Sequence, residues 1–133
     1  MKVGDQHIVA VTVTEKMVQQ FAEMSGDFNP IHMDEEFAKK TRFGRRIAHG
    51  MISGALISRA LANEMGNGIY MAQNMKFMNP VFIGDTVEVV LTVTNLREER
   101  GIGLIETLVR KQGSGEICVK GDATIMQGKA IAL

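Results

Sequence analysis

The chain has 133 residues, and its 15 basic and 15 acidic side chains cancel to a formal net charge of zero at pH 7. This balance gives no electrostatic basis for binding nucleic acid, and no apolar run approaches the length that crosses a bilayer. We expect one domain over residues 1–133, which is long enough to bury a hydrophobic core.

The first half of the chain is predicted to form helices after one short strand. Alternating apolar residues predict the strand, and Thr14 and Asp34 are suitable N-caps for the two helices that follow it. These elements are expected near His7–Val13, Thr14–Ser25 and Asp34–Ala38. The segment from His49 to Met65 is apolar around most of its circumference, which is typical of a buried central helix.

Beyond Gly66 the pattern changes to strands separated by typical turn compositions. The expected strands are Ile69–Met78, Thr86–Thr94, Ile102–Lys111 and Glu116–Met126. Helices followed by consecutive hairpins predict an α+β domain with an antiparallel sheet. One long helix wrapped by such a sheet is the hot-dog fold, and we predict that fold.

The cysteine and histidine content argues against disulfides and metals. Cys118 is the only cysteine, which excludes an internal disulfide and fits a reducing cytoplasm. Because it alternates with polar neighbours in an expected strand, it is predicted to be a small core residue. The three histidines show no metal-ligand spacing, and the N-terminus lacks the apolar core of a signal peptide. We therefore expect a cytoplasmic protein without a bound metal.

A carboxylate and an imidazole, Asp27 and His32, lie five residues apart across a turn. Pro30 fixes its own φ and biases Asn29 away from the helical region, so the chain must bend there. The bend can direct both side chains into one cavity, where they can hold and activate a water molecule. The alternative is an Asx turn, in which the polar side chains only cap backbone groups.

The run Gly26-Asp27-Phe28-Asn29-Pro30-Ile31-His32, followed by Ala48-His49-Gly50-Met51, resembles the MaoC-like, (R)-specific enoyl-CoA hydratase family. The later Asn79-Pro80-Val81-Phe82-Ile83-Gly84-Asp85 is similar to a strand connection of that family. The resemblance implies a hydro-lyase that adds water reversibly to a trans-2-enoyl-CoA and gives the (R)-3-hydroxyacyl-CoA. It also implies a hot-dog homodimer, with no cofactor beyond the coenzyme A of the substrate.

By this resemblance, Asp27 and His32 are the catalytic pair, and Asn29 shapes the turn or orients them. Gly50 would donate its backbone N–H to the thioester carbonyl, where enolate-like charge develops. A donor at a helix start suits that role because it has no partner in the helix and lies at the positive end of the dipole. Ser58 falls at the position of a family serine that supports these hydrogen bonds. Which of Asp27 and His32 delivers the proton to C2 stays open.

Coenzyme A carries phosphates, so cationic contacts are expected. Three arginines, Arg42, Arg45 and Arg46, lie in the loop before the central helix, and Lys76 lies in the first long strand. The arginine group is the preferred phosphate contact, and a solvated charge cluster is the alternative. His49 is either a residue that only leads into the helix, which we favour, or a partner of the catalytic pair.

Other functions are compatible with the same fold. A MaoC-like 3-hydroxyacyl-thioester dehydratase acting on acyl-carrier-protein substrates uses the same site in reverse. A thioesterase is disfavoured by the Asp-x-Asn-Pro-x-His spacing. A non-catalytic acyl-CoA-binding protein needs the pocket but not both Asp27 and His32. The acyl chain length and the physiological direction are not predicted.

Overall fold

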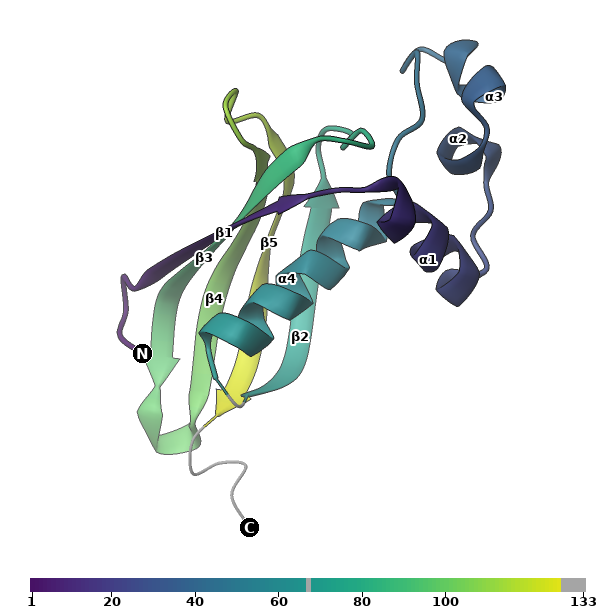
Figure 1. Ribbon diagram of the computed structural model, residues 1–133. Coiled ribbons are helices and arrows are strands. Elements are labelled where there is room, and N and C mark those ends of the chain that lie inside the picture. Colours follow the sequence, from purple (N-terminus) through teal and green to yellow (C-terminus); the bar gives the residue numbers. More distant parts are fainter. Residues whose placement is uncertain (67, 128–133) are drawn as a thin grey trace.

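The computed structural model describes residues 1–66 and 68–127 (Figure 1). The expectation of a single domain that reaches residue 133 extends beyond these residues. Within them the elements in chain order are β1 (Gln6–Thr12), α1 (Glu15–Ser25), α2 (Pro30–Met33), α3 (Glu35–Lys39), α4 (Gly50–Glu64), β2 (Gly68–Phe77), β3 (Thr86–Arg97), the 3-10 turn η1 (Glu98–Arg100), β4 (Ile102–Lys111) and β5 (Ile117–Gln127).

The five strands of the described residues form one antiparallel sheet in the order β1-β3-β4-β5-β2. Strands β3, β4 and β5 are consecutive neighbours, as the hairpin pattern predicted, whereas β1 and β2 form the two edges. Figure 1 shows the sheet curving around α4, which lies along its concave face. The predicted α+β arrangement, a sheet wrapped around one long helix, is therefore present.

The core lies between α4 and one face of the sheet. In β4, buried residues alternate with half-buried ones, so a single face of this strand points at the helix. Ile57 of α4 is fully buried, as are Leu91 of β3 and Ile105 of β4. Burying such side chains contributes about 1.5–3 kcal/mol each. This packing fixes α4 along the sheet and therefore fixes where its first residue lies.

The helix α4 is not buried on all sides, which differs from the prediction. Its exposed residues include Met51, Ala55, Ser58 and Ala62, which recur at helical spacing and form one face. The sheet covers only the opposite side of the helix. The neighbouring edge strand β2 is also exposed and apolar, with Ile69 51% and Met71 49% accessible.

The short helices begin at the predicted caps, α1 ends at Ser25 as predicted and α3 ends at Lys39, one residue beyond the prediction, and the structure has one additional helix. Thr14 caps α1 by accepting a hydrogen bond from the N–H of Met17, and Asp34 caps α3 in the same way. The addition is α2, a single turn that starts at Pro30 where only a bend was expected. Figure 1 shows α1, α2 and α3 gathered beside the end at which α4 begins.

Cys118 is fully buried in β5, which confirms its prediction as a core residue. Burial raises the pKa of its thiol and so disfavours the reactive thiolate. Among the helices of the described residues, none has the length and apolar character that crossing a membrane requires.

Candidate active site

The segment between α1 and α2 is held by a chain of short-range hydrogen bonds. Gly26 ends α1 in the left-handed region with φ +78°, and its N–H donates to the Ala22 carbonyl at 2.8 Å. The Asn29 N–H donates to Oδ1 of Asp27 at 3.1 Å, and the Asn29 side chain in turn caps α2 by accepting from the Ile31 N–H. The Asx-turn alternative is thus present, but it uses only one oxygen of the Asp27 carboxylate.

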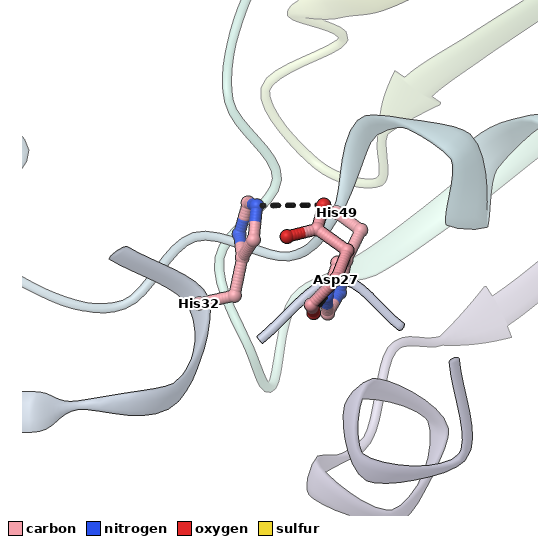
Figure 2. A group of neighbouring side chains, drawn as sticks. All are labelled: Asp27, His32 and His49. Carbon is pink, nitrogen blue, oxygen red and sulfur yellow. Dashed lines mark hydrogen bonds and ion pairs between the residues drawn. The ribbon is translucent and has the colours of Figure 1, made fainter. Parts of the chain in front are cut away.

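The second carboxylate oxygen faces His32. Oδ2 of Asp27 lies 3.8 Å from Nε2 of His32, as the dashed line in Figure 2 marks. Nδ1 of His32 lies 2.8 Å from the Ile47 carbonyl oxygen, which can only accept, so Nδ1 carries the hydrogen. In the neutral ring, Nε2 is therefore the free acceptor. Two acceptor atoms at this separation are suited to share the two hydrogens of one water molecule.

Gly50 is the first residue of α4, so its N–H has no acceptor within the helix. The side chain of the N-cap residue, His49, makes no capping hydrogen bond there. The ring of Phe77 packs against Gly50 so closely that a Cβ would lie 2.9 Å from Cε1 of that ring. Gly50 and His32 line one cavity of about 280 Å³. The structure thus brings the start of α4 and the His32 side chain to one cavity.

His49 contacts both members of the pair. Its Nε2 lies 2.8 Å from the backbone carbonyl oxygen of Asp27, and its ring stacks on His32 with centroids 4.1 Å apart (Figure 2). Asp27, His32 and His49 each offer a metal-ligating atom within 4.8 Å of the others, a proximity that sequence spacing did not reveal. Stacked rings direct their in-plane lone pairs side by side, and this arrangement does not resemble the converging ligands of one ion.

The two serines of α4 occupy different surroundings. Ser58, the residue predicted for the site, is exposed and lines a separate cavity of about 150 Å³. Eight residues separate it from Gly50, which corresponds to about 12 Å along a helix. Ser53, which sequence reasoning missed, is buried and lines the cavity of Gly50 and His32. Ser53 can be chosen over Ser58 only if the side of α4 that faces the turn between α1 and α2 is known. No local sequence pattern shows which side that is.

The four predicted cationic residues also separate. Arg46 is not available for phosphate, because its guanidinium donates to both carboxylate oxygens of Glu15 at 3.0 Å and to the His32 carbonyl at 2.6 Å. Arg45 stacks over Phe82 at 4.0 Å. Lys76 is exposed on β2, directly opposite Lys120. Arg42 lines the cavity and lies 4.9 Å from the Phe43 ring centroid.

Comparisons with known proteins identify the family of this chain. The family model of the MaoC like domain matches residues 4–113. The (R)-specific enoyl-CoA hydratase of Rhodospirillum rubrum is 40% identical, over 95% of this chain and 88% of that protein. A mitochondrial 3-hydroxyacyl-(acyl-carrier-protein) dehydratase of Arabidopsis thaliana is 29% identical, over 93% of this chain and 76% of that protein. The solved structure of an (R)-hydratase from A. caviae involved in PHA biosynthesis has a TM-score of 0.92 at 37% identity, over 96% and 98% of the two chains.

The antiparallel sheet around α4, shared with that solved structure, makes this a protein of the hot-dog fold, as predicted. The chain belongs to the MaoC-like domain family, since the family model covers most of its length. The resemblance inferred from the Asp27–His32 and His49–Gly50 segments is thereby confirmed.

Proposed function

We propose that this protein is an (R)-specific enoyl-CoA hydratase, a hydro-lyase that adds water reversibly to trans-2-enoyl-CoA and gives (R)-3-hydroxyacyl-CoA. The observation that carries the proposal is the pairing of Asp27 Oδ2 with His32 Nε2 at 3.8 Å, beside the cavity that His32 shares with the start of α4. The 40% identity to a curated hydratase supports it.

In the proposed reaction, the Asp27 carboxylate and Nε2 of His32 each accept a hydrogen bond from one water. The water oxygen forms a bond to C3 and loses a proton to the pair. The π electrons shift towards the thioester carbonyl, whose oxygen gains negative charge, and C2 then takes up a proton. The N–H of Gly50 stabilises the charged oxygen, because it is a donor with no acceptor within the helix and lies at the positive end of the α4 dipole. The addition is redox-neutral, so we propose no cofactor.

The substrate carrier is proposed to be coenzyme A, with Arg42 as the contact to its phosphates. Arg42 lines the cavity, whereas Arg46 is bound to Glu15 and Arg45 is stacked on Phe82. The alternative is a dehydratase acting on acyl-carrier-protein thioesters, and the 29% identity to such an enzyme supports this alternative.

We also propose a cytoplasmic location, which the unpaired Cys118 supports.

A homodimer is proposed because two exposed apolar surfaces adjoin. One is the uncovered face of α4 with Met51 and Ala55, and the other is the edge strand β2 with Ile69 and Met71. Met51 of α4 and Met71 of β2 line one common hollow of about 330 Å³. An unpaired edge with apolar side chains invites pairing with another strand, and a second copy of this chain supplies one.

The first prediction concerns the catalytic pair. Purified wild-type protein should remove the enoyl-thioester absorbance of crotonyl-CoA and yield the (R)-3-hydroxy product on chiral analysis. Asp27→Asn and His32→Ala should each lower kcat by about 10²–10⁴-fold, since general acid–base groups contribute that much. Asp34→Asn is the matched control, because Asp34 only caps α3 and an amide oxygen also caps. Free thiol release without hydration identifies a thioesterase, and binding without turnover identifies a binding protein.

The second prediction separates two glycines of α4. Gly50→Ala places a Cβ 2.9 Å from the Phe77 ring and displaces that ring at the cavity. A displacement of about 1 Å at a site can cost roughly 10²-fold in rate, so kcat/KM for crotonyl-CoA should fall by that order. In Gly54→Ala the Cβ meets the flexible ends of Met51 and Met75 at 3.2 and 3.3 Å, and activity should stay near wild type. Equal activity of the two variants contradicts the close approach at Gly50.

The third prediction tests the phosphate contact. Arg42→Ala should raise KM for crotonyl-CoA by up to about 5-fold, in line with about 1 kcal/mol for an exposed charged contact. It should leave KM for crotonyl-pantetheine, which lacks the nucleotide phosphates, unchanged. A parallel rise for both substrates assigns Arg42 to another role and returns the phosphate contact to Arg45 or Lys76.

The fourth prediction concerns assembly. On gel filtration, the wild-type protein should elute with an apparent mass of twice the 14.6 kDa of one chain. The Met71→Lys variant, substituted on β2, should elute as the monomer. Ile8→Lys is the control, since Ile8 is 49% exposed on β1 at the opposite edge of the sheet. A wild-type monomer at assay concentration, or dissociation by Ile8→Lys instead, contradicts the proposed surface.

A further inference from the structure

His49 touches each component of the proposed site and also lines the cavity of His32 and Gly50. Its ring nitrogen Nε2 bonds to the Asp27 backbone, its ring face stacks on His32, and its own peptide leads into Gly50. Figure 2 shows the three side chains gathered at one point. The sequence favoured a structural role for His49. These contacts show that the residues it supports are those of the proposed acid–base pair.

The hydrogen bond identifies the tautomer of His49. The Asp27 carbonyl oxygen can only accept, so the hydrogen resides on Nε2 of His49, 2.8 Å away. The other nitrogen, Nδ1, is buried and has no hydrogen-bond partner among the described residues. Leaving such an atom unpaired destabilises the fold, whereas a phenylalanine would fill the same space without that cost. The imidazole therefore serves through its single N–H and through its flat ring.

Both members of the acid–base pair depend on that ring for part of their position. The half-exposed Asp27 side chain extends from a turn between two helices. Among the described residues, His49 is the only hydrogen-bond donor to the Asp27 backbone carbonyl. His32 is held at one edge by the Ile47 carbonyl and on one face by His49 at an interplanar angle of 28°. Phe21 packs against His49 with ring centroids 4.8 Å apart. His49 thus packs against Phe21 on one side and contacts Asp27 and His32 on the other.

We propose that His49 is a positioning residue, which uses its Nε2–H and its ring face to hold Asp27 Oδ2 and His32 Nε2 at the separation that shares one water. This inference rests on the proposed hydratase function. His49 lines the cavity but acts through the pair, so its substitution should lower kcat much more than it raises KM for crotonyl-CoA.

Three variants separate the two contacts. His49→Phe keeps the ring between Phe21 and His32 but removes the donor, His49→Gln keeps a donor but removes the ring, and His49→Leu removes both. Phe and Gln variants should each lose about 10-fold in kcat, and Leu about 10²-fold, as expected for misplacement of reacting groups by up to 1 Å. KM for crotonyl-CoA should change less than twofold. Phe21→Leu, which loosens packing but keeps both contacts, should lose less than any of them.

Several outcomes overturn the proposal. Wild-type kcat in His49→Leu shows that the pair positions itself, and an unchanged kcat with a raised KM makes His49 a substrate contact. Wild-type kcat in His49→Phe reduces His49 to a space-filling residue, because the phenylalanine ring fills the same space without donating a hydrogen bond. Urea unfolding of each variant identifies losses that come from misfolding, and His49→Gln remains informative if the apolar variants do not fold.

A readout independent of turnover keeps this inference separate from the proposed function. Imidazole ¹⁵N spectra of the wild-type protein should show His49 as the Nε2–H tautomer and His32 as the Nδ1–H tautomer. Backbone amide shifts of Asp27 and Asn29 should move in His49→Leu and be largely retained in His49→Gln. If crotonyl-CoA is not hydrated but these signals are as expected, the function is wrong and the positioning stands. An Nδ1–H tautomer of His49 overturns the positioning whatever the activity.

Discussion

The burial of α4 against the concave face of the sheet is the constraint on which the rest of the structure depends. Side chains such as Ile57, Leu91 and Ile105 are fully buried between the helix and the strands, and they fix the helix along its length. The N–H of the first residue of a helix has no acceptor within that helix, so fixing α4 also fixes the position of the Gly50 donor. The loop from α1 to α2 needs only to reach that end of the helix to place a carboxylate and an imidazole beside that donor.

The Asp27 carboxylate resolves two interpretations that the sequence presented as alternatives. One oxygen accepts the Asn29 N–H, as an Asx turn requires, and the other faces His32. The turn hydrogen bond to one oxygen therefore orients the other oxygen towards His32. A carboxylate has two oxygens with separate lone pairs, so a residue can build its own loop and still take part in chemistry. His32 is divided in the same way. Its Nδ1 bonds to the Ile47 carbonyl and fixes the ring, and its Nε2 faces Asp27.

The features that could be predicted from the sequence are those that local patterns determine. Alternation predicted the strands, caps at Thr14 and Asp34 predicted helix starts, and the Asp27–His32 spacing predicted a proximity that the structure contains. Contacts between distant segments could not be predicted, because they depend on which side of α4 faces which loop. The buried Ser53 and the engagement of Arg46 with Glu15 arise in that way. So does the ring stack of His49 on His32.

The ring of Phe77 has a consequence for how the cavity and the sheet edge are related. This residue ends β2, the edge strand, and it is 54% exposed, yet its ring also rests against Gly50 at the first turn of α4. The Phe77 side chain is therefore part of the edge of the sheet and also part of the cavity wall. Any partner that covers the β2 edge at Phe77 therefore also contacts a residue that lines the cavity.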